Sequence, residues 1–148
     1  MMIITFCGHA DFQETEEYKR EMLNFLEETV GDQPAQMYLG GYGRFDRFSY
    51  ACCKAYQKTH PNVSLVYVSP YLNECHLQHP QTCYDAVIYP PIENKPLKFA
   101  IVYRNKYMVE QADCVVACIS RTFGGAYQTY QHAKKKGKPI LNLAVFEE

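Results

Sequence analysis

The sequence predicts an α/β fold in which a doubly wound, mainly parallel five-stranded sheet carries helices on both faces. One observation is a series of short apolar runs rich in β-branched residues, typical of strands buried on both faces. The other is that segments with helical spacing of apolar residues separate these runs, as in right-handed βαβ units. With 148 residues and 47% hydrophobic content, we expect one domain over residues 1–148 with its own core.

The first half of the chain contains two expected helices between three expected strands, at residues 2–7, 37–39 and 63–68. The first helix is expected over residues 15–30, and Asp11 and Glu14 have the spacing of a capping box ahead of it. The second helix follows a glycine-rich turn at residues 40–43 and ends before His60. Strand, helix and strand therefore alternate from the start.

The second half begins with a long proline-rich connection over residues 70–97, a length typical of functional or lid-like loops. Residues 86–89 form a short extended piece inside it, outside the five-stranded sheet. Beyond it we expect a helix, a strand, a helix and a last strand, at residues 99–112, 114–119, 126–136 and 139–145.

Composition excludes several classes of protein. The formal charge of -1, the pI near 6.5 and the scattered Lys and Arg residues provide no basic footprint, so we expect no nucleic-acid partner. The apolar run at residues 1–7 is too short for a membrane span or a signal peptide, so we expect no membrane partner and a cytoplasmic location. The cysteines are odd in number, seven, and several lie in apolar runs, which indicates reduced, mostly buried thiols.

One cluster has the composition of a metal site: Cys75, His76, His79 and Cys83. Its spacing matches no common zinc knuckle, and the surrounding segment is otherwise a proline-rich loop. We therefore expect no metal.

Two glycine-rich turns, at residues 40–43 and 124–125, each begin an expected helix. Glycines at a helix start bring bare N–H groups close to a ligand, and the helix dipole favours phosphate there. In a doubly wound sheet, ligands bind at the carboxyl ends of the strands, where we expect the loops at residues 8–11, 40–46 and 121–125 to meet. An ordinary tight turn remains the alternative at both places.

Several side chains in these loops have both a functional and a structural interpretation. His9 can bind a phosphate or be satisfied by the backbone, and Asp11 can bind a ligand or cap the first helix. Asp46 can accept ribose hydroxyls or complement the helix dipole, whereas Arg104 can bind ligand or pair with Glu93 or Glu110. The tyrosines Tyr42, Tyr71, Tyr103 and Tyr127 can stack on a base or lie at a subunit contact. The candidate ligand-binding residues are Gly8, His9, Asp11, Gly40, Gly41, Tyr42, Gly43, Asp46, Tyr71, Arg104, Asn105, Gly124, Gly125, Ala126 and Thr129.

These motifs together resemble the SLOG superfamily, the Rossmann-like group that includes SMF/DprA proteins and the LOG nucleoside-monophosphate phosphoribohydrolases, and most of all its small bacterial YpsA-like branch. The matching segments are Cys7-Gly8-His9, Gly40 to Gly43, Arg104-Asn105-x-x-Met108 before Asp113, and Gly124-Gly125-x-x-x-Thr129. The resemblance implies a Rossmann-like fold and a nucleotide or nucleotide-derived ligand, such as an ADP-ribose-like or cyclic-nucleotide molecule.

The LOG enzymes use an Arg and a Glu, and only the Arg has a counterpart here, Arg104. The Glu position falls on Gln131, which cannot take a proton or stabilise an oxocarbenium ion by charge. Hydrolysis would need a carboxylate from Asp46 or Asp11, so Arg104 and Asp46 are the catalytic candidates if the protein is an enzyme.

We therefore expect a nucleotide-binding sensor or sequestering protein in nucleotide signalling, with a nucleotide-derived ligand and no cofactor that the sequence identifies. A LOG-like phosphoribohydrolase and a DprA-like single-stranded DNA-binding module are the alternatives. The thirteen tyrosines favour a homo-oligomer, because amphipathic tyrosines are common at subunit contacts.

Overall fold

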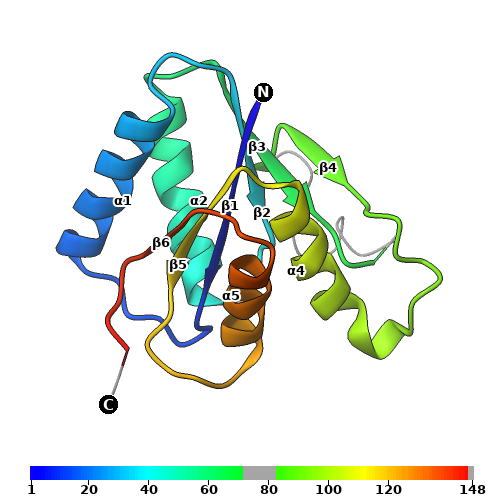
Figure 1. Ribbon diagram of the computed structural model, residues 1–148. Helices are drawn as coiled ribbons and strands as arrows, with labels where there is room; N and C mark the ends of the chain where they lie inside the picture. Colours follow the sequence, from blue (N-terminus) through cyan, green and yellow to red (C-terminus); the bar gives the residue numbers. More distant parts are fainter. Residues whose placement is uncertain (72–82, 147–148) are drawn as a thin grey trace.

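The computed structural model describes residues 1–71 and 83–146 of the chain. Within this described part, six parallel strands form one sheet in the order β4-β3-β2-β1-β5-β6 (Figure 1). The strands are β1 (Met2–Gly8), β2 (Ala35–Leu39), β3 (Val63–Val68), β4 (Ala86–Ile88), β5 (Cys114–Cys118) and β6 (Ile140–Asn142).

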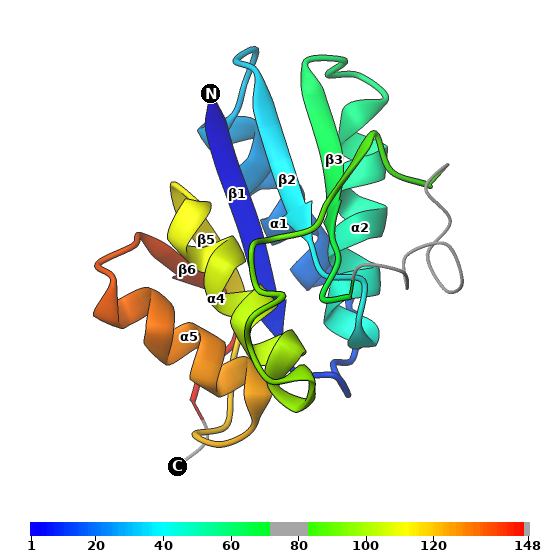
Figure 2. The ribbon, with the colours of Figure 1, turned by 90° about the vertical axis from the view of Figure 1, so that its right-hand side faces the viewer.

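Helices cover both faces of this sheet. Helices α1 (Glu16–Thr29) and α2 (Gly43–Gln57) pack on one face, and α4 (Ala100–Gln111) and α5 (Gly125–Lys135) pack on the other (Figures 1 and 2). A short 3-10 helix, η2 (Leu97–Phe99), leads into α4. The predicted α/β doubly wound architecture is confirmed.

The predicted number of strands, five, is wrong for the described residues, because the extended piece after residue 85 joins the sheet as edge strand β4. Val66 of β3 is in register with Ala86, and Val68 with Ile88. The side chain of Asp85 fixes this edge by accepting a hydrogen bond from the Leu65 N–H at 2.8 Å. Three residues are too few to display a strand pattern in the sequence.

The core covers both faces of the sheet. On the α1–α2 face, the rings of Phe12, Phe45 and Phe48 pack with centroids 5.0–5.9 Å apart above the sheet. On the opposite face, Val109 of α4 and Ala133 of α5 are fully buried against β5. The sheet is therefore buried on both sides, as its continuous apolar runs predict.

The capping box predicted ahead of the first helix is wrong. Thr15 is the N-cap of α1, and its side-chain oxygen accepts a hydrogen bond from the Tyr18 N–H at 3.1 Å. A turn closed by the Phe12 N–H and the His9 carbonyl oxygen (3.1 Å) precedes it, and Asp11 in that turn pairs with Arg121 instead. Asp11 therefore contacts the loop after β5 and does not cap α1.

The strand order reverses at β1. From β1 the chain runs outward to β2, β3 and β4, and it then returns to the other side of β1 as β5. The crevice at the carboxyl ends of β1 and β5 is the place where such sheets bind ligands. Among the residues described, no helix is both long and apolar enough to cross a membrane.

Candidate ligand-binding site at the carboxyl edge of the sheet

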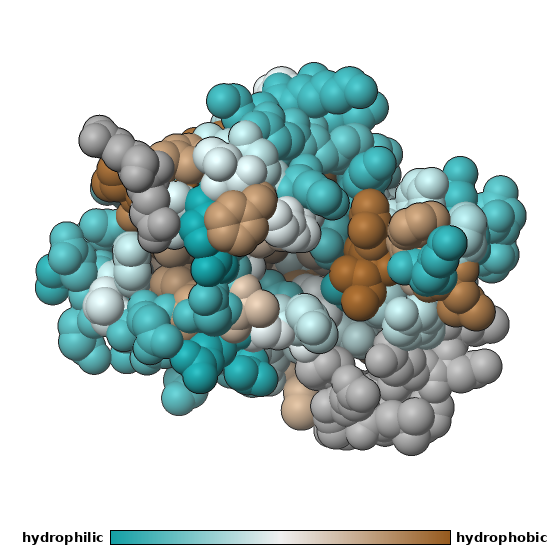
Figure 3. Space-filling view, turned by 90° about the horizontal axis from the view of Figure 1, so that it is seen from below, coloured by the Kyte–Doolittle hydropathy of each residue, from teal (hydrophilic) through white to brown (hydrophobic). Residues whose placement is uncertain are grey.

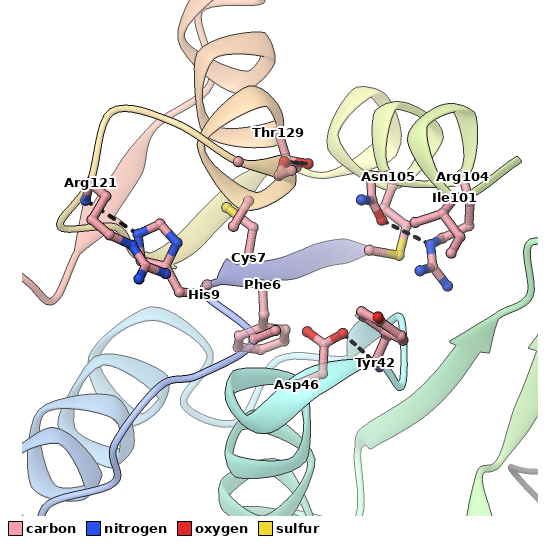
Figure 4. A pocket seen from close by; sticks show the side chains of 16 residues that line it. Phe6, Cys7, His9, Tyr42, Asp46, Ile101, Arg104, Asn105, Arg121 and Thr129 are labelled. Carbon is pink, nitrogen blue, oxygen red and sulfur yellow. Dashed lines mark hydrogen bonds between the residues drawn. The ribbon is translucent and has the colours of Figure 1, made fainter. Parts of the chain in front are cut away.

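A pocket of about 300 Å³ opens at the carboxyl ends of β1 and β5, the point where the strand order reverses. Its walls come from the end of β1, the start of α2, the middle of α4 and the start of α5 (Figure 4). The view onto this edge shows brown hydrophobic surface among teal and pale residues (Figure 3). Exposed Tyr42, Ile101 and Phe123 are among the apolar side chains of these segments.

The pocket gathers residues that are far apart in the sequence. The predicted candidates that line it are Gly8, His9, Tyr42, Asp46, Arg104, Asn105, Gly124, Gly125, Ala126 and Thr129. The candidates that do not line it are Asp11, Gly40, Gly41, Gly43 and Tyr71. The lining residues absent from our predicted list are Phe6, Cys7, Ala10, Ile101, Met108 and Arg121.

The start of α5 is open to this pocket. Gly124 precedes the helix with φ 95°, a conformation that favours glycine, and in the described part of the chain no side chain caps this end. A Cβ added at Gly124 or Gly125 would meet no atom within 4 Å, so the backbone of the first turn borders open space. Uncapped N–H groups at a helix start are donors suited to an anion.

The start of α2 is closed by the protein itself. The Tyr42 N–H donates to the Asp46 carboxylate at 2.8 Å, and the Arg44 N–H donates to the Ala10 carbonyl oxygen at 3.1 Å. Gly43 has φ 89°, and a Cβ on it would lie 3.0 Å from the Ala10 Cα. The first glycine-rich turn therefore packs against the loop after β1, while the second borders the pocket.

Asp46 lies in the pocket wall opposite Arg104 and Thr129 (Figure 4). Burial raises the pKa of its carboxyl group to about 6, and this rise is limited by the Tyr42 N–H and by the positive charge of Arg104. Asp46 is thus a carboxyl group that changes charge near neutral pH and faces the space a ligand would occupy.

Arg104 lies in the pocket wall, is 2% exposed and connects α4 to the ends of β2 and β3. One guanidinium nitrogen, Nη1, donates to the carbonyl oxygens of Gly40 and Val68, both at 2.9 Å, and Nε donates to the Asn105 side chain at 2.9 Å. A Cβ on Gly40 would lie 3.1 Å from the Arg104 Cζ, so Gly40 leaves room for this side chain. Glu110, one predicted partner of Arg104, contacts His132 at 2.8 Å.

His9 connects the loops after β1 and β5. Its Nε2 accepts hydrogen bonds from the Ser120 and Arg121 N–H groups, at 3.2 and 3.3 Å. Backbone N–H groups thus satisfy Nε2 of the ring, and a contact between His9 and a ligand stays a prediction. Position in the chain was the only signal for Arg121, which follows the end of β5.

Arg121 brings a second positive charge to the pocket. Its guanidinium group makes two hydrogen bonds to the Asp11 carboxylate, at 3.0 and 2.8 Å, and lies 5.5 Å from the centre of the Phe123 ring. The hydrogen bonds from Arg121 lower the pKa of Asp11 below its ordinary value. Asp11 therefore holds the side chain of Arg121, which lines the pocket, without lining the pocket itself.

The Cys7 thiol lines the pocket but is unsuited to nucleophilic chemistry. Burial raises the pKa of the Cys7 thiol to about 12, which leaves it protonated and a poor nucleophile. Over residues 1–71 and 83–146, no three His, Cys, Asp or Glu side chains are placed to hold a metal ion. Of the cluster considered for zinc, Cys75, His76 and His79 lie outside the described residues.

This chain is similar to known proteins in its structure and not in its sequence. The sequence matches no protein-family model, and no curated protein matches it. The structural genomics target TM1055 superposes with a TM-score of 0.60 and 14% identity over 95% of this chain and 72% of its own. DNA processing protein A from Helicobacter pylori, studied for single-stranded DNA binding, superposes with a TM-score of 0.61 and 17% identity over 94% of this chain and 63% of its own. The molybdenum cofactor carrier protein from Chlamydomonas reinhardtii superposes with a TM-score of 0.54 and 16% identity over 94% of this chain and 73% of its own.

These structures share the Rossmann-like α/β fold expected for this chain. At identities of 14–17% the likeness concerns the fold alone. Membership of the YpsA-like branch and the identity of the ligand therefore stay predictions. This chain spans less than two thirds of DNA processing protein A.

Proposed function

We propose that this protein binds a nucleotide or a nucleotide-derived signalling ligand, ADP-ribose-like or cyclic, and acts as a sensor or sequestering protein. The observation that carries the proposal is the uncapped start of α5, which borders the pocket at Gly124 and Gly125. A phosphate there accepts hydrogen bonds from the first N–H groups of the helix and gains from its dipole.

Charges and rings around the pocket favour the same class of ligand. Arg104 and Arg121 lie in its wall, where their positive charge favours an anionic ligand. The Tyr42 ring is 67% exposed at the start of α2 and is free to stack on a base. Groups suited to a phosphate and to a base therefore lie around one pocket.

Gly125→Ala tests the proposal, because the new methyl group stands in the space that a phosphate needs. Calorimetry with AMP, ADP-ribose, cyclic ADP-ribose isomers and cyclic dinucleotides measures the affinity. We expect the wild type to bind at least one of them, and the substitution to weaken binding about tenfold or more, equal to about 1.4 kcal/mol or more.

Thr122→Ala, in the same loop but outside the pocket lining, is the matched control and leaves the affinity unchanged. Absence of heat with every ligand at high micromolar concentration would remove the proposal. Equal affinities of the wild type and Gly125→Ala would mean that the phosphate does not bind at the start of α5.

An N-glycosidic phosphoribohydrolase is the second candidate, favoured by Asp46. Its raised pKa of about 6 and its place in the pocket are properties of a general acid or base. Chromatography of nucleoside monophosphates after incubation measures released base. Base that appears with the wild type and not with Asp46→Asn supports hydrolysis, whereas intact nucleotide in both samples supports binding alone.

Single-stranded DNA is the third candidate, because DNA processing protein A shares the fold. The net charge of -1 argues against it. Retention of an oligonucleotide that falls steeply with salt concentration would favour DNA over a small nucleotide.

A further inference from the structure

A groove between α4 and α5 continues from the pocket at the sheet edge. It has a volume of about 540 Å³ and runs along the side-by-side helices seen in Figure 2. Ile101, Asn105, Gly125 and Thr129 line both cavities. The first turn of α5, where we place the phosphate, therefore lies at the junction of two spaces.

The groove carries positive charge. Lys106 of α4 and Lys135 of α5 line it, and both are exposed. None of the described lining residues is a carboxylate, and the nearby carboxylate of Glu110 is held by His132 at 2.8 Å. The groove is thus complementary to an anionic or strongly polar group.

The remaining groove surface suits a planar polar ring. Val102 and Ile101 supply apolar wall, while the amide side chains of Gln128 and Gln131 supply hydrogen-bond donors and acceptors. Apolar walls with a few polar groups are typical of small-molecule sites.

The groove extends away from the phosphate position at Gly125 along most of α5. Gly125 and Lys135 are ten residues apart on α5, about 15 Å along the helix at 1.5 Å per residue. A mononucleotide with its phosphate at Gly125 extends from that phosphate in one direction only. With its nucleoside in the pocket at the sheet edge, it leaves the groove empty.

We propose that the ligand is two-headed: two nucleoside or sugar halves joined through phosphate, with the linking phosphates at the first turn of α5. One half occupies the pocket at the sheet edge, and the other lies in the groove between α4 and α5 and reaches toward Lys106 and Lys135. This inference rests on the proposed function and narrows its ligand class to dinucleotides and nucleoside diphosphate sugars.

The test compares AMP, which has one half, with the two-headed probes ADP-ribose and cyclic di-AMP by calorimetry. We expect at least one two-headed probe to bind about tenfold or more tightly than AMP, equal to about 1.4 kcal/mol. The double variant Lys106→Glu/Lys135→Glu reverses the groove charge and should abolish this advantage while AMP affinity stays unchanged. Gln128→Trp, which fills the groove without a change of charge, should do the same.

Lys98→Glu/Lys134→Glu is the matched control, because it changes net charge equally at exposed lysines outside the groove lining. It should leave the affinity of every probe as in the wild type. Equal affinities for AMP and both two-headed probes, with no effect of either groove variant, overturn the two-headed ligand and leave nucleotide binding intact. Failure of all three probes to bind overturns the two-headed ligand, whereas nucleotide binding itself falls only if every ligand of the wider calorimetric panel fails as well.

Discussion

At the scale of single residues, Asp46 and Arg104 each do a structural task and line the pocket as well. Asp46 accepts the Tyr42 N–H at the start of α2, and Arg104 holds the carbonyl oxygens after β2 and at the end of β3. Loss of either side chain therefore removes contacts within the protein in addition to any contact with a ligand. Isosteric substitutions separate the two effects better than alanine.

Asp46→Asn should remove a pH dependence of stability. The folded protein binds the Asp46 proton more tightly than the unfolded chain does, since burial raises its pKa from 3.8 to about 6. Ionisation of Asp46 therefore lowers the stability of the wild type as pH rises from about 4 through 6, and this loss is complete above the folded pKa.

Urea unfolding of both proteins at pH 4, 5, 6 and 7 measures this difference. Relative to the wild type, Asp46→Asn should gain stability with rising pH, by on the order of 1 kcal/mol because the pocket admits solvent. A difference that stays constant from pH 4 to 7 would show that Asp46 does not titrate in that range.

At the scale of elements, two helix starts with similar glycine-rich sequences have opposite surroundings. The start of α2 is closed by Asp46 and by Ala10 of the loop after β1, whereas the start of α5 is uncapped in the described residues. Gly43 serves close packing of backbone, and Gly125 borders the pocket. The two glycines should therefore respond differently to the same substitution.

Gly43→Ala should lower the free energy of unfolding by about 1–3 kcal/mol, because a side chain at φ 89° is strained and its Cβ lies 3.0 Å from the Ala10 Cα. Gly125→Ala adds a Cβ in open space, so it should leave stability unchanged within about 0.5 kcal/mol. Thermal unfolding of both variants compares them directly. A melting temperature of Gly43→Ala equal to that of the wild type would mean that the turn relaxes without cost.

At the scale of the whole molecule, the thiols report on the core from both faces of the sheet. Cys52 and Cys53 are buried residues of α2, and Cys7 and Cys118 are buried at the carboxyl ends of β1 and β5. Burial raises the pKa of Cys52 to about 12 and that of Cys118 to about 11. Thiols that stay protonated react slowly, so their alkylation measures global opening.

A Cys75→Ser/Cys83→Ser variant should take up almost no iodoacetamide at pH 8 while folded. The five cysteines that remain are Cys7, Cys52, Cys53, Cys114 and Cys118, all free thiols with raised pKa values. Mass spectrometry should find them unmodified in buffer and all modified in denaturing urea. Rapid modification of several of them in buffer would mean that the core opens far more readily than this packing allows.

The sequence by itself determined the order and type of most elements. Helical spacing such as Met22 and Leu26, and apolar runs such as residues 63–68, reflect burial of one helix face or of both strand faces, and this periodicity is local. Because ligands bind at the carboxyl ends of parallel strands, the sequence also predicted that the loops at residues 8–11, 40–46 and 121–125 meet at one edge of the sheet. Fold class and the region of the candidate pocket follow from this local information.

Only the tertiary structure decided which groups face the pocket. The Asp11–Arg121 pair joins residues 110 positions apart, and the Arg104 bond to the Gly40 carbonyl spans 64 positions. The closed start of α2, the open start of α5 and the pairing of β4 with β3 also depend on contacts between distant segments. A local pattern specifies how a segment folds, but the partner of a polar group depends on which other segments pack beside it.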